Sequence, residues 1–365
     1  MSNYIEYENL IGFHPGSYVE DIIDDLNISQ NEFAERLGTS SKTVSELVNG
    51  LCNISPDLAY KLEQLTSISF EMWMNLQNAY DKKKAEIEAR MVSDEDEVAD
   101  KIDLKYFKVN GLIEDKKYFR EEKKEVLRSK LNVANLLYFK KFNSQVSYRN
   151  KDAFSDESII NSNVMLELAE NISRNKTDTK LNINKLKSYY EEIKRLISKD
   201  YDDFLPALKD ILLDCGIVLV ALPHLRNSGL NGACKKFKNG SVLLLITDRN
   251  KRADIFWFSL LHELGHIVNR DFYTNELDMK EYESKERIAN DFAADFLLDR
   301  KNYKNFVEDG DFSIEAIEKF ANAENVITCI LTGRLKNDGL IEHKAYNSYN
   351  TYYEISLDKD EVKSA

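Results

Sequence analysis

Apolar residues recur with a different spacing in each of three parts of the chain. From residue 17 to about 80, short runs with helical spacing follow one another closely. From 81 to about 200, helical spacing continues in a charged sequence with almost no Gly or Pro. After residue 200, "GIVLVALP" (216–223) and "GSVLLLIT" (240–247) are short runs rich in Val, Ile and Leu and bounded by Gly or Pro, which predicts two β-strands. The segment "SGLNGACKKFKNG" between them has the composition of a connecting loop, and a second helical block closes the chain.

Charge and cysteine content narrow the class of protein. The 365 residues carry a formal net charge of -13, so any contact with nucleic acid requires a local patch rather than the field of the whole molecule. The four cysteines lie far apart without a C-x-x-C pair, which argues against a disulfide framework and against a cysteine zinc site. We find no signal peptide and no apolar run approaching the roughly 20 residues of a membrane helix, so we expect a cytoplasmic protein without a membrane partner.

The N-terminal region contains two short helices joined by a tight turn. In "ISQNEFAERLGTSSKTVSELVNG" (28–50), Ser29 followed by Glu32 forms a capping box that starts one helix, and Gly38 ends it. Ser40 caps the helix that follows at once. This arrangement predicts a helix-turn-helix.

A metal-binding motif lies in the apolar run "FWFSLLHELGHIVNR" (256–270). A helix has about 3.6 residues per turn, so His262 and His266 stand one above the other on the same face, about 6 Å apart. The pattern H-E-x-x-H is the zincin motif, in which both histidines are metal ligands and Glu263 is the general base. Because Zn2+ lowers the pKa of a bound water from about 15.7 to roughly 7, Glu263 can take that proton near neutral pH.

A third protein ligand must come from later in the chain. The metzincin spacing would require Gly and His at the positions held by Asn269 and Phe272, so that branch is excluded. The next predicted helix, "ESKERIANDFAADFLL" (283–298), carries Glu286 on one side with two alanines that are small enough to let helices approach closely. We therefore expect Glu286 to be the third ligand. Glu283, one turn earlier, is the alternative, and both are also ordinary acids of a first helical turn.

These segments together resemble the ImmA/IrrE family of metallopeptidases. The resemblance covers about residues 200 to 345 and rests on "DIFWFSLLHELGHIVNR", "ERIANDFAADFLL" and "GRLKNDGLI", while "GIVLVALPHL…NGA…SVLLLITDRNK" is similar to the family's small sheet. It implies a zinc endopeptidase that cleaves transcriptional repressors, with the carboxylate ligand of the family's E-x-x-A-[ND] helix at Glu286. One departure is "LLDRKNY", which lacks the Pro that usually ends this helix in the family and leaves the metal ligands intact.

A zincin commonly holds its substrate as an added strand along the sheet edge next to the metal helix, through main-chain hydrogen bonds. "SVLLLIT" (241–247) is the candidate for that edge strand. His224, Tyr273 and Tyr282 are candidates for stabilising an oxyanion, and an ordinary surface position is the alternative for His224. The two remaining histidines have no motif around them.

The region from "HPGSYVEDIIDDL" to "FEMWMNLQNAYD" resembles the Xre-type, HigA-like antitoxin family. The resemblance implies that the second helix of the pair enters the major groove of operator DNA. The residues that would contact DNA are then Ser41, Lys42, Thr43, Glu46 and Asn49.

The charge of this region weakens the expectation of DNA binding. Residues 17–80 contain three basic and ten acidic residues, a balance of -7. Phosphate neutralisation supplies most non-specific affinity, so the module should bind DNA weakly unless a homodimer doubles the contacts. Operator DNA and a protein partner are therefore two alternatives for this module.

The sequence thus predicts an α+β, predominantly helical protein in four parts. These are an Xre/HigA-like helix-turn-helix domain (1–80), a helical connector (81–200), an ImmA/IrrE-like, zincin-like domain with a small sheet (201–345) and a C-terminal tail (346–365). The expected function is zinc-dependent cleavage of a repressor or antitoxin in a stress, phage or mobile-element response. The alternative is a non-catalytic, antitoxin-like transcriptional regulator that binds operator DNA or a toxin.

Overall fold

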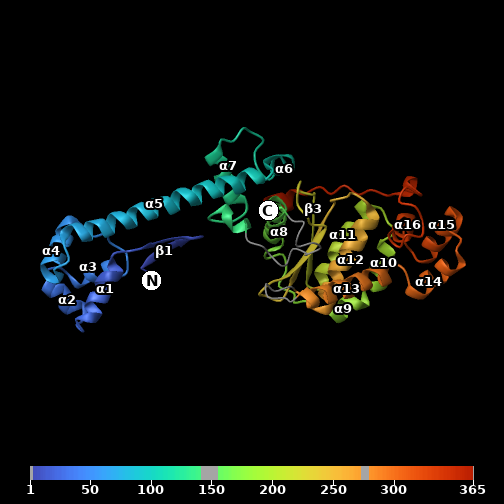
Figure 1. The fold of residues 1–365 in the computed structure, drawn as a ribbon. Helices are drawn as coiled ribbons and strands as arrows, with labels where there is room; N and C mark the ends of the chain where they lie inside the picture. Colours follow the sequence, from blue (N-terminus) through green and yellow to red (C-terminus); the bar gives the residue numbers. More distant parts are fainter. Residues whose placement is uncertain (1–2, 141–154, 273–278, 365) are drawn as a thin grey trace. The chain divides into compact units, whose positions relative to one another are not determined.

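The computed structural model describes residues 3–140, 155–272 and 279–364, and the chain divides into two compact units, residues 1–97 and 98–365. The predicted fold class is confirmed, because most elements are helices and the strands form small sheets (Figure 1). Helix α5 (Phe70–Lys101) begins in the first unit and ends in the second. No helix within the described ranges combines the length and the apolarity that crossing a membrane requires.

The first unit is a β-hairpin followed by a bundle of short helices. Before α5, its elements are β1 (Tyr4–Tyr7), β2 (Leu10–Phe13), α1 (Gly16–Asp25), α2 (Gln30–Leu37), α3 (Ser41–Val48) and α4 (Pro56–Thr66). The hairpin is absent from the sequence prediction because four-residue strands leave little alternation to detect. The helices enclose an apolar core in which Phe33, Val44 and Trp73 are fully buried.

The predicted helix-turn-helix is confirmed, and its local signals act as expected. The Ser29 hydroxyl accepts a hydrogen bond from the Glu32 N–H at 3.2 Å, and the Ser40 hydroxyl accepts one from the Thr43 N–H at 3.1 Å. Each satisfies a backbone donor that the first turn of its helix leaves unpaired. Gly38 ends α2 with φ +65°, a left-handed conformation that glycine adopts without steric cost.

The sheet of the second unit corrects two predictions. Its strands are β3 (Ile217–Leu222), β4 (Gly232–Lys236) and β5 (Val242–Thr247), in the order β3-β5-β4, with β5 parallel to β3 and antiparallel to β4. The run "SVLLLIT" is therefore the central strand, and its predicted place at the edge is wrong. The predicted loop contains the edge strand β4. A run that is apolar at every position indicates a strand buried on both faces, whereas the Gly and Lys residues of β4 suit an edge.

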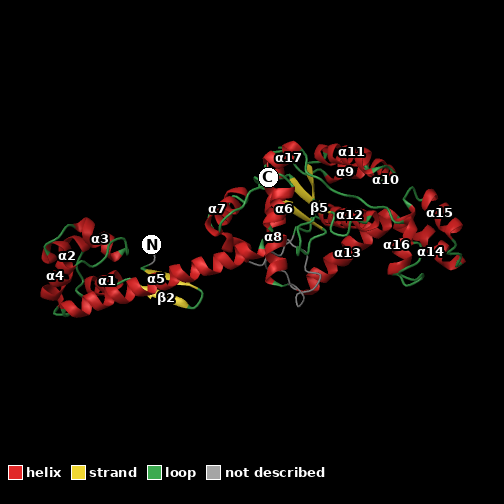
Figure 2. Cartoon of the chain, turned by 90° about the horizontal axis from the view of Figure 1, so that it is seen from above, coloured by secondary structure: helices red, strands yellow, loops and turns green. Residues whose placement is uncertain are grey.

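The sheet separates two hydrophobic cores. The even-numbered residues of β5 pack in one core, together with α11 (Tyr201–Asp214) and α12 (Ala253–Asn269). Leu243 and Leu245 point to the other face of the sheet and pack in the second core, together with α8 (Asp156–Ser173). Figures 1 and 2 show α8 on one side of the strands and α12 on the other. Part of the predicted connector thus forms a layer of the second unit.

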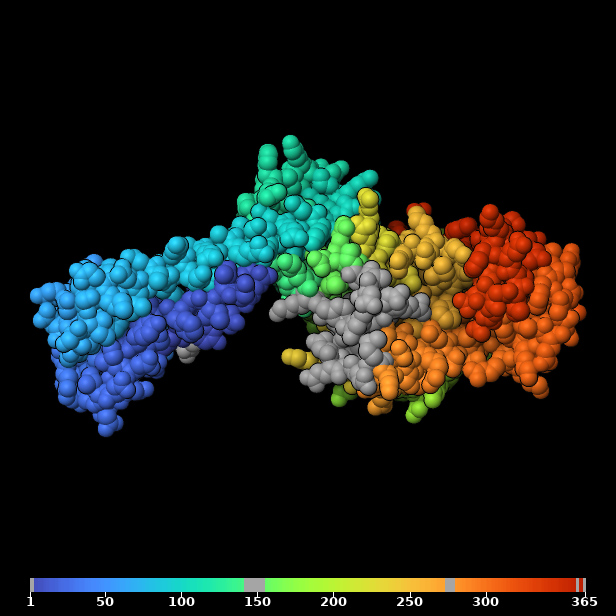
Figure 3. Space-filling view, viewed as in Figure 1, coloured from blue at the N-terminus to red at the C-terminus, as the bar shows by residue number. Residues whose placement is uncertain are grey.

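The other elements of the second unit surround these layers. They are α6 (Leu104–Val109), α7 (Arg120–Lys130), η1 (Leu136–Lys140), α9 (Ile183–Ser188), α10 (Tyr190–Leu196), α13 (Met279–Leu297), α14 (Arg300–Asp309), α15 (Ile314–Ala323), α16 (Thr328–Asn337), η2 (Asn347–Tyr349) and α17 (Lys359–Ser364). The deep-orange residues of α14 to α16 gather at one end of the unit (Figure 3).

The segment predicted as a C-terminal tail packs against the second unit. The Tyr353 N–H donates to the Lys251 carbonyl at 2.7 Å, and the Ile355 N–H donates to the Asp248 carboxylate at 3.0 Å. The side chains of Tyr353 and Ile355 are buried in the core that contains α12. This segment therefore contributes to the core of the second unit around α12.

Candidate metal centre

Helix α12 carries three ionisable side chains into the interior. His262, Glu263 and His266 are at most 6% exposed. The helix also buries Trp257 and Leu260 in the core beneath the sheet. Burying an ionisable group costs several kcal/mol unless it is hydrogen-bonded, paired with a charge or bound to a metal ion. The groups that face these three side chains therefore decide what the site can do.

Helix α13 packs directly against this face of α12. A Cβ atom built on Gly265 would lie 3.0 Å from the Cα of Ala289, and Ala289 and Ala293 are fully buried. The predicted close approach is thus present, with glycine on one helix and alanines on the other. It positions Glu286, which is 8% exposed, over the two histidines.

Three potential ligands converge at one point between the helices. The Nε2 atoms of His262 and His266 are 3.1 Å apart. One carboxylate oxygen of Glu286 lies 3.4 Å from the Nε2 of His262, and the other lies 3.4 Å from the Nε2 of His266. These side chains form a buried His/His/Glu group that could hold a metal ion.

The donor set fits a zinc ion. Ligands at about 2.0–2.1 Å from a tetrahedral Zn2+ lie about 3.3 Å from one another, close to the three separations found between His262, His266 and Glu286. Two imidazole nitrogens and a carboxylate that face one another at these distances repel unless a proton or a cation lies between them. The three residue types are also those that zinc prefers in catalytic sites.

Asn290 orients the first histidine, and the sequence prediction assigned it no role. Its Oδ1 atom lies 3.0 Å from the Nδ1 of His262. An amide oxygen only accepts, so this contact places the proton of His262 on Nδ1 and leaves Nε2 with its lone pair toward Glu286. Asn290 follows Glu286 by four residues and therefore lies on the same face of α13. This spacing in the sequence could have identified Asn290 as a neighbour of the site.

Glu263 lies against the edge strand β4. A Cβ atom built on Gly232 would lie 2.8 Å from the Cγ of Glu263, so a side chain at this position would displace the carboxylate. The thiol of Cys234 lies beside the Glu263 carboxylate and interacts with it. Burial raises the pKa of Glu263, and the nearby histidines oppose that rise. The same burial raises the pKa of the Cys234 thiol far above its usual value, so this thiol stays protonated as a donor.

Among the described strands β4 pairs only with β5, although its residues Gly232 to Cys234 are buried. The Asn231 carbonyl accepts a hydrogen bond from the Thr247 N–H at 2.8 Å, so Asn231 faces β5. Residues of an antiparallel strand alternate between facing the neighbour and facing away. The main-chain groups of Gly232 and Cys234 therefore point away from β5, and among the described strands β4 forms this edge of its sheet. They are also the two residues of β4 that approach Glu263.

A groove of about 640 Å³ adjoins this arrangement between α12, α13 and α16. Asn290, which contacts His262, and Asn231, which precedes β4, both line it. Phe258 and Ile330 contribute apolar surface. The groove therefore begins beside the candidate metal ligands and the edge strand.

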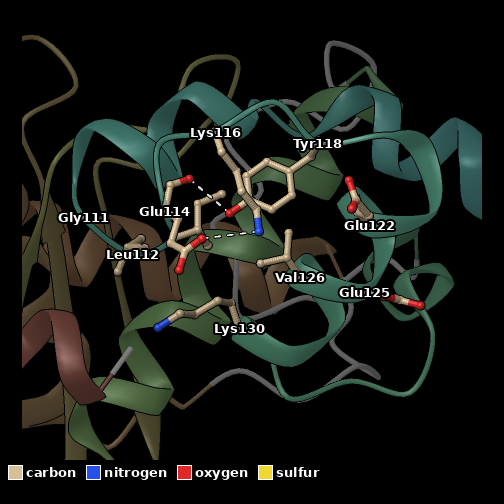
Figure 4. Close-up of a pocket in the computed structure, with 10 residues that line it drawn as sticks. Gly111, Leu112, Glu114, Lys116, Tyr118, Glu122, Glu125, Val126 and Lys130 are labelled. Atoms are coloured by element: carbon tan, nitrogen blue, oxygen red, sulfur yellow. Dashed lines mark hydrogen bonds and ion pairs between the residues drawn. The ribbon is translucent and has the colours of Figure 1, made fainter.

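A second hollow, of about 630 Å³, lies at the loop between α6 and α7 (Figure 4). Its polar groups largely satisfy one another. The Tyr118 hydroxyl donates to the Glu114 carbonyl at 3.0 Å, and the Lys116 ammonium lies 3.3 Å from the Glu114 carboxylate. It contains none of the groups predicted to carry chemistry.

The other residues considered from the sequence lie in different settings. Glu283 is exposed, whereas Glu286 is buried beside the histidines. His224 is half-buried in the loop after β3, with its Nδ1 atom 3.3 Å from the Ser228 hydroxyl. Tyr282 is buried on α13, and Tyr273 lies outside the described residues.

The five residues predicted to contact DNA lie on or directly after α3. Ser41 and Lys42 are exposed. The Thr43 hydroxyl lies 2.8 Å from that of Ser40, and the Lys42 ammonium lies 3.6 Å from the Glu46 carboxylate. The Asn49 amide donates to the Ser45 carbonyl at 2.7 Å, which occupies it at the end of the helix.

Comparison with known proteins assigns the two ends of the chain to two families. The helix-turn-helix family model matches residues 19–73. The model of the IrrE N-terminal-like domain, named for the M78 peptidases, matches residues 231–331. The chain belongs to the helix-turn-helix regulators and carries an IrrE-like peptidase domain. The second match includes the histidines of α12 and Glu286.

Individual relatives each match about a fifth of this chain. The HTH-type transcriptional regulator YddM of Escherichia coli (strain K12) is 38% identical over 72 residues, which are 20% of this chain and 77% of that protein. Virulence-associated protein A' of Dichelobacter nodosus is 36% identical over 69 residues, 19% of this chain and 60% of its own.

Two solved structures also match. An addiction module antidote protein of a HigA family from Coxiella burnetii is 34% identical, with 20% of this chain and 80% of that chain covered and a TM-score of 0.20. A Pseudomonas aeruginosa protein in complex with its operator DNA is 33% identical. The match covers 20% of this chain and 81% of that chain, with a TM-score of 0.20.

Proposed function

We propose that this chain is a metal-dependent endopeptidase with His262, His266 and Glu286 as ligands and Glu263 as general base. The observation that carries this proposal is the convergence of three buried ligand groups, within 4.8 Å of one another, beside a buried acid and the edge strand of the sheet. When bound, a divalent ion such as Zn2+ supplies Lewis-acid polarisation of the scissile carbonyl and of an attacking water.

Glu263 has the surroundings of a proton carrier. Burial raises its pKa, which brings the carboxylate closer to the pH at which it both accepts and releases a proton. It would take a proton from the attacking water and later return it to the leaving amine. Cys234 lies beside this carboxylate on β4 and would limit its orientation.

The edge strand provides a way to hold a polypeptide at the site. The outward main-chain groups of Gly232 and Cys234 can pair with an extended segment, which would then pass beside Glu263. The groove that begins at Asn231 and Asn290 offers room for the segment beyond the scissile bond. Space on both sides of the cut favours cleavage within a chain over removal of a terminal residue.

The proposed substrate is a transcriptional repressor or an antitoxin. The ImmA/IrrE resemblance supports this choice, and so does the helix-turn-helix domain on the same chain, which would bring the peptidase to operator-bound proteins.

The test replaces the acid that is expected to move the proton. Glu263→Gln should retain the bound metal, measured by elemental analysis, and should lower cleavage by about 10²–10⁴-fold. Cleavage is measured on a library of peptides from a digested proteome and on a co-expressed repressor. Glu283→Gln, an exposed acid on the neighbouring helix, is the matched control and should leave both quantities unchanged. Full activity in the Glu263 variant would show the proposal to be wrong.

A second candidate function is an antitoxin-like regulator that binds operator DNA or a toxin and cuts nothing. The sequence similarity of the first unit to an HTH-type transcriptional regulator favours this second function. The exposed Ser41 and Lys42 at the start of α3 can reach DNA, while three basic against ten acidic residues in 17–80 oppose strong binding.

This candidate has its own test in the first unit. Lys42→Ala with Thr43→Ala should abolish the mobility shift of a duplex from the region upstream of the gene if α3 reads DNA. Lys82→Ala, an exposed lysine on α5, is the control for loss of a positive charge alone. An unchanged shift in the double variant would exclude α3 as the reading helix.

A further inference from the structure

We propose that four lysines beyond the far end of β4 form a docking surface for acidic residues of the polypeptide substrate. The lysine cluster consists of Lys176, Lys180, Lys236 and Lys238, all of which are exposed. This inference rests on the proposed peptidase function, because it extends the path of a segment bound along β4.

Two segments distant in sequence bring these lysines together. The Asn239 amide donates to the Thr177 carbonyl at 3.1 Å, and the Leu181 N–H donates to the Gly240 carbonyl at 3.0 Å. A Cβ atom built on Gly240 would lie 3.1 Å from the Cγ of Lys180. The loop 176–181 therefore lies against the turn 236–241 that connects β4 to β5.

The charge of the cluster is not neutralised by neighbours. Lys235 and Lys185, close in sequence, form ion pairs with Glu170 at 2.5 Å and with Asp214 at 2.6 Å. Within the described part of the chain, the four lysines of the cluster make no ion pair with a carboxylate. Asp178 is the one acidic residue in 176–181 and 236–241.

This local excess of positive charge contrasts with the chain as a whole, whose net charge is -13. Surface potentials of opposite sign to the rest of a molecule select partners and speed their association. The cluster is therefore a place where an acidic segment can bind to a protein whose overall charge is negative.

The cluster lies where a bound substrate segment would pass. β4 runs from Gly232, beside Glu263, to Lys236, four residue steps that span about 14 Å at about 3.4 Å per residue. An extended segment paired with β4 has the same rise. Its residues roughly three to five positions from the scissile bond would therefore face the lysine cluster.

Nucleic acid is the other polyanion that four lysines attract. The position of the cluster at the end of the edge strand β4 favours a peptide, because main-chain groups that point away from β5 can pair with an extended polypeptide. Binding of duplex DNA is an outcome that the experiment must separate.

The experiment measures binding on the full-length Glu263→Gln chain, so that no cleavage intervenes. The probe is a fluorescent peptide with a run of glutamates toward one end, compared with the same peptide carrying glutamines. The acidic peptide should bind more tightly at low salt, and high salt should remove the difference. Lys236→Glu with Lys238→Glu should weaken its binding by roughly tenfold and leave the glutamine peptide unaffected.

The matched control is Lys301→Glu with Lys319→Glu, two exposed lysines on or beside α14 and α15. It changes net charge equally and should leave peptide binding unchanged. Equal binding of both peptides, or an equal effect of both double variants, overturns the proposal. The proposal is also wrong if duplex DNA binds more tightly than the acidic peptide and the Lys236 and Lys238 variant weakens that DNA binding.

The result can be told apart from failure of the peptidase proposal. A chain with native Glu263 that cleaves nothing, combined with lysine-dependent binding of the acidic peptide, removes the peptidase function and keeps the docking surface. A chain that cleaves acidic and neutral peptides equally well, with no effect of the Lys236 and Lys238 variant, keeps the peptidase and removes the docking surface.

Discussion

Two helix pairs in this molecule bury opposite kinds of side chain. In the first unit, α2 and α3 meet through apolar residues such as Phe33 and Val44, and Lys42 and Ser41 stay at the surface. In the second unit, α12 and α13 meet with His262, His266 and Glu286 between them. The first pair meets through apolar side chains and presents its polar groups outward, whereas the second encloses polar groups that need a partner.

The difference indicates where to look for chemistry in a protein of this kind. A helix with exposed polar residues can exchange contacts with DNA or protein at little cost to its own stability. A helix pair with buried ionisable groups is stable only when those groups are satisfied, so its fold and its ligand are coupled. Changes at the two pairs should therefore have different consequences.

The largest effect is expected from removal of a proposed ligand. Glu286→Ala takes one of three donors from the centre and leaves two histidine nitrogens 3.1 Å apart. Bound zinc, measured by elemental analysis after dialysis, should fall to a small fraction of one ion per chain. Glu283→Ala, an exposed acid one turn away, should keep the metal. Equal metal content in both variants would contradict the assignment of Glu286.

The next effect concerns the residue that orients His262. Asn290→Leu removes the oxygen that lies 3.0 Å from Nδ1 and should weaken zinc binding by about 10–100-fold. Asn290→Asp keeps an acceptor at that position and should retain most of the affinity. Competition with a chelator of known affinity measures both, and a loss of equal size in the two variants would argue against this positioning role.

A smaller effect is expected at the contact between the helices. Gly265→Ala places a Cβ atom 3.0 Å from the Cα of Ala289 and should lower the free energy of unfolding of the second unit by about 1–3 kcal/mol. Gly38→Ala in the first unit meets no atom within 4 Å, and its cost of about 1 kcal/mol comes only from the left-handed backbone. Urea denaturation followed separately in each unit measures the loss of stability in the two variants. A larger loss for Gly38→Ala than for Gly265→Ala would contradict the prediction.

The smallest effect concerns a buried histidine of the first unit. His14 is 1% exposed, its Nδ1 accepts a hydrogen bond from the Gly16 N–H at 3.0 Å, and burial lowers its pKa below the usual 6.5. Asp81 opposes this shift and Lys84 adds to it. Because the folded pKa is depressed, the stability contribution is complete above about pH 6.5 and is lost as the pH falls through the folded value.

The fluorescence of Trp73, recorded in a Trp257→Phe background, follows the stability of the first unit against pH. Trp73 belongs to the core of that unit and Trp257 to the other. His14→Gln should flatten the decline below pH 6.5. A decline that persists unchanged in the variant would assign it to other groups.

Much of the first unit could be predicted because its signals are local. A serine hydroxyl that reaches the third N–H of its own helix needs no information from elsewhere in the chain, and Ser29 and Ser40 form these caps as expected. The helical period likewise determined that His262 and His266 share one face. The hairpin β1–β2 escaped prediction because its strands are short.

The edge strand could not be predicted, because strand order depends on pairing between distant segments. "SVLLLIT" looked like an independent strand, and only its pairing with β3 on one side and β4 on the other showed that it is central. The contact of Cys234 with Glu263 follows from that strand order. The local sequence around either residue does not predict this contact.

By itself, the sequence determined that two imidazoles and a neighbouring acid occupy one helical turn, because 3.6 residues per turn is a property of the backbone. For the third ligand, the sequence allowed both Glu283 and Glu286 on the following helix. Only the tertiary structure decided between exposed and buried carboxylates, by packing Ala289 against Gly265 and bringing one face of α13 over the histidines. The physical reason is that ligand separations of 3–4 Å are set by how closely two helices approach, and that distance depends on side chains from both.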